Sequence, residues 1–163
     1  MRKTYQKIQF ILFAMAAVGA AAAADRSTAV DAVEYLKKAQ AYVKANGVEK
    51  SIVEFNNSEG PFNTKSDINK NGDFYIFSTD KNGFQTIHGM NPRVRGTNKL
   101  DMRDQDGVYL VREFVKLCFG SPAGKGWVSY RWPHPVTKEM ETKMGYVERV
   151  PGTDLCLGTG IYK

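Results

Sequence analysis

The chain has 163 residues, of which 23 are lysine or arginine, 17 are aspartate or glutamate, two are cysteine and two are histidine. A chain of this length usually forms one domain. Because the cysteines and histidines are not closely spaced, they argue against a structural zinc site.

The first 24 residues have the pattern of a secretory signal peptide. A short basic start precedes the apolar stretch 8–20, and a run of alanines then offers small-residue cleavage sites. The alternative is an uncleaved anchor, but the apolar stretch is shorter than the roughly 18–20 residues that a membrane span needs. We therefore expect residues 1–24 to be removed and residues 25–163 to form one soluble periplasmic domain without a later membrane span.

Removal of this segment changes the charge balance. Three basic residues and no acidic residue lie in residues 1–24, so the remaining chain has 20 basic and 17 acidic residues, a net charge of +3. Export and this mild, dispersed charge argue against a nucleic-acid-binding protein. A modest positive balance suits anionic small molecules as ligands.

The two cysteines, Cys118 and Cys156, leave two possibilities open. In an oxidising compartment such a pair can form a disulfide. They could equally be two buried thiols on different elements.

The first part of the chain favours helices. Ser27 or Thr28 can cap a helix in which Val30, Val33 and Leu36 recur at helical spacing, and Gly47 ends it. A shorter helix should follow near 48–55, and the stretch after it, as far as residue 72, reads as a loop.

From residue 73 the pattern changes to that of strands. Segments 73–80 and 83–89 are rich in aromatic and β-branched residues and are separated by an Asp/Asn/Gly turn, which predicts a hairpin. A long loop should precede a helix that begins at residue 106 and is closed by Gly120 and Pro122. Three more strands are predicted over 126–132, 143–150 and 155–162. The order indicates an α+β fold with a five-stranded antiparallel sheet.

The stretch "DINKNGDFYIF", residues 67–77, resembles the start of a calcium-binding loop. Asp67, Asn69 and Asn71 occupy the first ligand positions, but Ser78 stands where a bidentate glutamate is required. The residues after the loop also favour a strand over the expected exit helix. We therefore interpret this stretch as a turn and expect no metal site.

Candidate chemistry is concentrated on the predicted strands. His88 ends the second strand, and Lys143 lies on the fourth. Aromatic residues share faces of the first and third strands: Tyr75 with Phe77, and Tyr130 with Trp132. Each of these residues could equally have a purely structural role in the core or at the surface.

An enzyme is not expected from this sequence. There is no G-x-S-x-G motif. A pairing of Cys118 with His88 as nucleophile and base is open from spacing alone, and no other feature supports it.

The order of motifs resembles the single Cache type 2 family of extracellular sensor domains. That family shows a strand, a D-x-x-G turn, a strand ending in histidine, N-P, G-x-N, and a second D-x-x-G that opens a helix. The corresponding residues here are 74–77, 80–83, His88, 91–92, 96–98 and 104–107. The tail segments "GKGWVSYRWPHP" and "TKMGYVERVPGTDLCLGTGIY" are similar to the closing strands of the family, and the resemblance covers about residues 28–163.

The resemblance implies a PAS-like fold, with a long N-terminal helix packed across a five-stranded antiparallel sheet. It also implies a pocket for a small organic acid, in which Lys143 and His88 face the anion and Tyr75, Phe77, Tyr130 and Trp132 form the walls. Arg93 and its neighbour Arg95, in the long loop, would close over the ligand, unless they are simply solvated. No cofactor is implied.

Members of the family usually sit between two membrane spans of a chemoreceptor or kinase, whereas this chain ends at Lys163. We therefore expect a free-standing version that passes its signal to a membrane-bound kinase or chemoreceptor. The main alternative is a partner-binding module whose pocket is filled by its own side chains.

Overall fold

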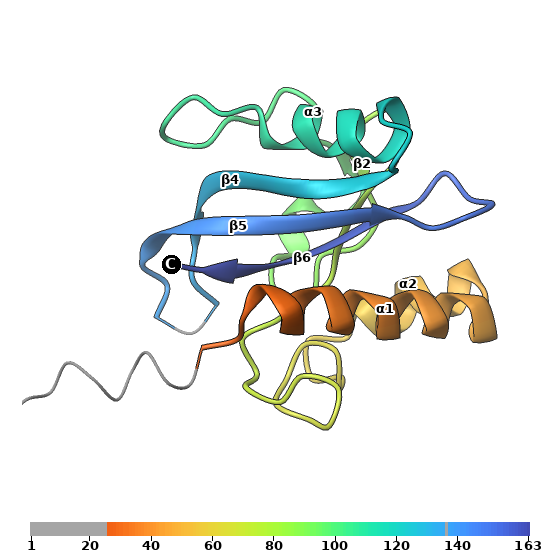
Figure 1. The fold of residues 1–163 in the computed structure, drawn as a ribbon. Helices are drawn as coiled ribbons and strands as arrows, with labels where there is room; N and C mark the ends of the chain where they lie inside the picture. Colours follow the sequence, from red (N-terminus) through yellow and green to blue (C-terminus); the bar gives the residue numbers. More distant parts are fainter. Residues whose placement is uncertain (1–25, 136) are drawn as a thin grey trace, which may run out of the picture.

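The computed structural model describes residues 26–135 and 137–163. Its centre is an antiparallel sheet, with two N-terminal helices on one face and a third helix on the other (Figure 1). The predicted signal peptide, residues 1–24, lies outside the described residues.

The two N-terminal helices follow from their caps and apolar spacing. Helix α1 (Ala29–Asn46) begins with a capping box in which Thr28 and Asp31 bond each other's backbone N–H groups, and it ends at Gly47, whose φ of +82° favours glycine. Helix α2 (Val48–Asn56) follows directly. The side chains of α1 that face the core are Ala32, Tyr35, Leu36, Ala39 and Val43. Val30, which was expected on the apolar face, is 68% exposed.

The main sheet contains β1 (Phe77–Thr79), β4 (Lys125–Pro133), β5 (Met140–Arg149) and β6 (Cys156–Tyr162). Their order across the sheet is β1-β6-β5-β4, and every neighbouring pair is antiparallel. The last strand of the chain therefore lies between the first strand and the β4–β5 hairpin. The predicted combination of helices, antiparallel sheet and long N-terminal helix is confirmed.

The predicted second strand is interrupted, so this sheet has four strands among the described residues where five were expected. Strand β2 (Phe84–Gln85) pairs with β3 (Thr97–Asn98), and only His88 bridges to β1, at Phe77. The N–H groups of Ser78 and Gly89 still donate to the Ile87 and Ile76 carbonyls, but the Ile87 N–H donates to Ser78 Oγ over 3.0 Å and so leaves the ladder. On the edge away from β1, Asn56 Oδ1 accepts the His88 N–H over 3.0 Å.

The long loop contains a short 3-10 helix, η1 (Pro92–Val94), and leads to α3 (Leu110–Val115), which continues as a π-helical segment, η2 (Lys116–Gly120). Helix α3 begins four residues later than predicted. The reason is the Asp104 carboxylate, which accepts the N–H groups of Asp106 and Val108 over 3.0 and 2.8 Å and so holds residues 104–108 in a turn.

The residues that resemble a calcium loop have structural partners. The Asn69 side chain is fully buried and bonds the backbone of Phe62 and Phe74. The Asp73 carboxylate accepts the N–H and hydroxyl of Ser27 over 2.8 and 2.7 Å, just before α1. This loop therefore anchors the start of the helix.

The two faces of the sheet carry different cores because neighbouring strand residues point to opposite sides. Tyr146 and Leu157 pack with α1 and α2, whereas Val147 and Cys156 pack with α3. A disulfide joins Cys156 of β6 to Cys118 of η2. Cys118 is therefore not a thiol, and the Cys118–His88 pairing left open from spacing is ruled out.

Candidate ligand-binding site

The candidate site lies on the α3 face of the sheet, where facing strands align the predicted residues. Lys143 of β5 is directly opposite Tyr130 of β4 on one side and Tyr162 of β6 on the other. Alternation along the strands places all three side chains on the same face as Val147.

Lys143 is the unusual residue of this face, because its side chain is fully buried. Its Nζ lies 3.9 Å from the ring centroid of Tyr75, 5.1 Å from that of Tyr162 and 5.4 Å from that of Phe77. Among the described residues it has no hydrogen-bond partner and takes part in none of the ion pairs. Burial lowers the pKa of this amine well below its ordinary value.

Glycines make room for these side chains on the sheet. A Cβ atom added at Gly160 would lie 2.7 Å from Lys143 Cε and 2.5 Å from the Met144 carbonyl oxygen. One added at Gly145 would lie 2.7 Å from the Tyr130 ring, and one at Gly158 would lie 2.3 Å from the Phe77 ring. The glycines of β5 and β6 thus form a floor across which larger side chains lie.

Above this floor is a small aromatic cavity. Helix α3 and the preceding segment 99–109, here called the roof, cover it on the side away from the sheet (Figure 1). Its volume is about 10 Å³, room for about one water molecule. The lining residues are Tyr75, Phe77, Gln85, His88, Met102, Leu110, Phe114, Tyr130 and Trp132.

His88 lines this cavity as a neutral ring. It is 4% exposed, and it stacks on Tyr75 with ring centroids 4.9 Å apart. Burial, with the nearby charges of Lys143 and Arg95, lowers the pKa of His88 to about 3. Because Nδ1 accepts the Asn91 N–H over 3.0 Å, Nε2 carries the ring proton.

Six of the eight residues named for the ligand pocket are brought together. Tyr75, Phe77, His88, Tyr130 and Trp132 line the cavity, and Lys143 lies directly against the Tyr75 ring. Arg93 is not among them: it is exposed on η1. Its neighbour Arg95 turns inward and donates to the carbonyl oxygens of His88 and Gly89.

Sequence reasoning missed several residues of the site. Leu110 and Phe114 fall within the helix predicted from residue 106 but were not assigned to the cavity. Tyr162 could have been found from strand parity, since it lies six residues after Cys156 on the same face. Gln85 and Met102 come from loop geometry that the sequence pattern does not specify.

Among the described residues, no helix combines the length and apolar composition needed to cross a membrane. Nor do three metal-binding side chains gather in the ranges 26–135 and 137–163.

The match to known proteins decides the family. A family model described as a Cache domain, dCache_2, matches residues 35–163. The chain belongs to the Cache domain family. The resemblance to Cache sensor domains is thereby confirmed, while the single-Cache subtype stays a prediction.

Curated relatives of this Cache domain are a sensor kinase and chemotaxis receptors. The sensor histidine kinase MctS of Rhizobium johnstonii is 29% identical over 61% of this chain, and the methyl-accepting chemotaxis protein CtpM of Pseudomonas aeruginosa is 33% identical over 59% of it. The matched parts are 20% and 17% of those two proteins, so the chain spans about a fifth or less of their length.

Solved structures share the fold. A methyl-accepting chemotaxis protein from Vibrio parahaemolyticus superposes with a TM-score of 0.64 at 23% identity, covering 82% of this chain and 86% of that one. A structure described as the basis for carboxylic acid recognition by a Cache chemosensory domain superposes with a TM-score of 0.57 at 25% identity, covering 78% and 83%.

Proposed function

We propose that this Cache domain senses a small organic acid, which it binds in the aromatic cavity with Lys143 as the counter-charge. The observation that carries the proposal is the fully buried Lys143 amine, which has no hydrogen-bond partner among the described residues. A buried charge is costly unless it is paired and hydrogen-bonded. A carboxylate would supply that partner.

The surrounding residues support the proposal. The Nε2–H group of neutral His88 can donate a second hydrogen bond to a carboxylate oxygen. Phe77, Phe114 and Trp132 can contact the apolar part of the ligand. One neighbouring Cache structure is described as recognising a carboxylic acid.

The affinity expected for such a ligand is modest. A very small ligand gains at most about −1.5 kcal/mol for each non-hydrogen atom. An acid of about four such atoms is therefore limited to about −6 kcal/mol, a Kd of tens of micromolar. This range suits a sensor of nutrients more than a scavenger of traces.

The proposal extends to location and partner. We infer that the domain works in the periplasm and passes its loaded state to a membrane-bound chemoreceptor or kinase. The disulfide suits an oxidising compartment. One structural neighbour is described as a periplasmic sensor domain of a chemotaxis protein. The curated relatives are receptors and a kinase.

Isothermal titration calorimetry with a panel of small mono- and dicarboxylates tests the binding step. At least one acid should bind to residues 25–163, and Lys143→Met should weaken it at least tenfold because the counter-charge is lost. Lys50→Ala, which removes an exposed charge from α2, is the matched control and should leave the affinity unchanged. Absence of binding across the panel, or equal affinity in Lys143→Met, would refute the proposal.

A further inference from the structure

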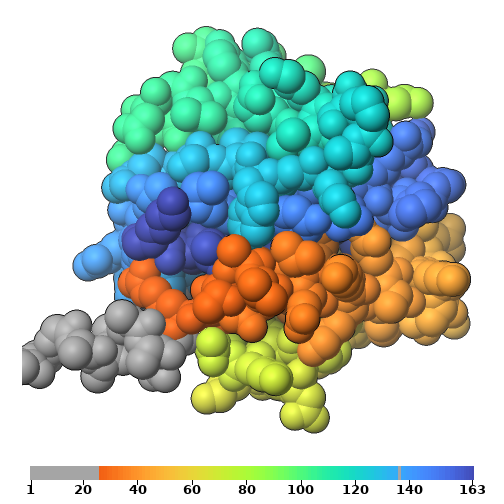
Figure 2. All heavy atoms as spheres, in the orientation of Figure 1, coloured from red at the N-terminus to blue at the C-terminus, as the bar shows by residue number. Residues whose placement is uncertain are grey.

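A groove lies apart from the aromatic cavity, between the C-terminal half of α1 and the turn that joins β5 to β6. Figure 2 shows the turn residues lying against the C-terminal part of α1 on this face. The groove has a volume of about 570 Å³. This is within the range of roughly 300–1,000 Å³ that is typical of small-molecule sites.

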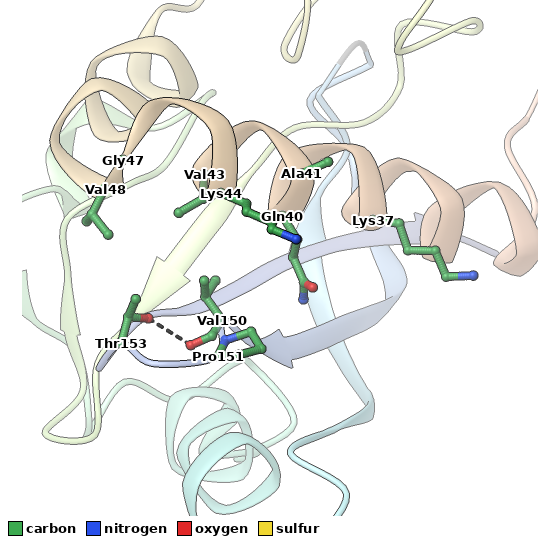
Figure 3. Close-up of a pocket in the computed structure, with 10 residues that line it drawn as sticks. All are labelled: Lys37, Gln40, Ala41, Val43, Lys44, Gly47, Val48, Val150, Pro151 and Thr153. Carbon is green, nitrogen blue, oxygen red and sulfur yellow. Dashed lines mark hydrogen bonds between the residues drawn. The ribbon is translucent and has the colours of Figure 1, made fainter.

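The walls of the groove are apolar and held in place by hydrogen bonds. Val43, Val48, Val150 and Pro151 are among its lining residues. On the strand side, Val150 N–H donates to the Leu155 carbonyl over 2.8 Å, and the Thr153 hydroxyl donates to the Val150 carbonyl over 2.9 Å (Figure 3). The groove therefore exists before any ligand arrives.

Gln40 places a hydrogen-bond donor without a partner among these apolar side chains. Figure 3 shows its side chain extending from α1 toward the strands of the β5–β6 turn. The Nε2 atom is buried and has no hydrogen-bond partner among the residues that the structure describes. A buried donor left without an acceptor destabilises the folded state. Because this atom has no accessible surface in the unliganded domain, the partly buried side chain must turn its amide into the groove to donate to an oxygen atom of a ligand.

Two cations flank Gln40 on the same face of the helix. Lys37 and Lys44 lie three residues before and four residues after it, the spacing that places helical side chains together. Both are exposed, and neither belongs to an ion pair of the described residues. The acceptor that fits beside the Gln40 amide is therefore an anionic one.

We propose that this groove is a second ligand site, for an amphipathic carboxylate larger than the acid expected in the aromatic cavity. One carboxylate oxygen accepts from the Gln40 amide, and the ammonium groups of Lys37 and Lys44 balance the charge. The apolar body of the ligand covers Val43, Val48 and Val150. Because the groove and the aromatic cavity share no lining residue, this site does not depend on the proposed function.

Phenylbutyrate is a suitable probe because it joins one carboxylate to an aromatic body. In isothermal titration calorimetry it should bind to residues 25–163, and its neutral analogue phenylbutanol should bind at least tenfold more weakly. The double variant Lys37→Ala/Lys44→Ala should reduce phenylbutyrate affinity about tenfold, whereas Lys50→Ala should not change it.

Ala41→Trp tests the place of binding. Residue 41 is exposed and lines the groove, so the indole should occupy the groove without disturbing the core, and binding should disappear. Gln40→Leu should fold at least as stably as the parent and bind phenylbutyrate at least fivefold more weakly. Thermal unfolding confirms that each variant is folded.

Lys143→Met separates the two sites, because phenylbutyrate binding should survive this change. Absence of phenylbutyrate binding to the parent chain would overturn the proposal. Binding that persists in Ala41→Trp would also overturn it, and so would binding that is lost in Lys143→Met alone.

Discussion

At the scale of single residues, Lys143 combines a cost to folding with a proposed benefit to binding. Its amine is removed from water, and only the faces of aromatic rings replace the lost hydration. Cation–π contacts of this kind contribute about 2 kcal/mol when desolvated, less than full hydration provides. An apolar residue of similar length should therefore make the unliganded domain more stable.

The first residue-scale prediction concerns pH. The folded pKa of Lys143 is lowered below its unfolded value of 10.5, so between these two values the unfolded chain binds more protons and stability should rise with pH. The slope should reach at most about 1.4 kcal/mol per pH unit. Urea unfolding of the unliganded parent and of Lys143→Met, from about pH 7 to about pH 10, measures the effect.

The variant serves as the reference in that experiment, because other groups titrate equally in both proteins. Lys143→Met should be more stable by about 1–3 kcal/mol near neutral pH, and its advantage should shrink as the pH rises. A constant difference across the range would show that the burial of Lys143 does not lower its pKa.

The same residues show how far strand parity can be used. Alternation along segment 126–132 was enough to predict that Tyr130 and Trp132 share a face, because a strand fixes the direction of each side chain. That Lys143 lies on the same face was implied only by the family resemblance, since parity within one strand does not set its register against a neighbouring strand. Arg93 could not be predicted in the same way. It lies on a 3-10 turn, and the choice between Arg93 and Arg95 for the inward position depends on loop geometry.

At the scale of elements, β6 matters as much for its missing side chains as for its hydrogen bonds. Gly158 and Gly160 alternate with Thr159 and Ile161, so one face of this strand is bare while the other packs toward α1. The bare face is what allows the Lys143 side chain to lie flat against the sheet.

Gly160→Ala tests this use of β6. The new methyl group would meet the Met144 carbonyl oxygen and Lys143 Cε, so the strand must shift. We expect a loss of about 1–3 kcal/mol of unfolding free energy and weaker binding of the acid identified by calorimetry.

Gly120→Ala is the matched control for that substitution, because its Cβ would meet nothing closer than 4.0 Å. It should unfold at nearly the parent temperature and bind the acid equally well. Equal stability of the Gly160→Ala and Gly120→Ala variants would contradict the role given to the bare face of β6.

Most elements were predictable because their signals are local. The Thr28 cap and Gly47 define α1, and the aromatic and β-branched runs of β4, β5 and β6 define three strands. The interrupted strand after β1 was not predictable. Ser78 Oγ takes the Ile87 N–H out of the ladder, and the outer edge of the segment is bonded by Asn56, which is 32 residues away from the His88 amide that it binds.

At the scale of the whole molecule, the sheet and the roof enclose a cavity that holds about one water molecule. Even a two-carbon acid needs more room, so a ligand can enter only if part of the enclosure moves. The floor belongs to the continuous β4–β5–β6 ladder. The roof begins in a loop and a turn, so it is the part expected to open.

Hydrogen–deuterium exchange followed by mass spectrometry can test this expectation. When the acid identified by calorimetry is added, peptides that cover residues 99–115 should exchange more slowly, because the ligand holds the roof closed. Peptides from β5 should change little, since their amides are already protected in the ladder. Slower exchange confined to β5, with the roof unaffected, would contradict this mode of entry.

The disulfide between Cys118 and Cys156 determines the form that such opening can take. It fastens the far end of the α3–η2 helix to the central strand, while residues 99–109 carry no covalent tie to the sheet. The roof should therefore rotate about its end at Cys118 when it opens. Displacement should be smallest there and increase toward Met102, so the Met102 end of the roof is the natural place for a partner to distinguish a loaded domain from an empty one.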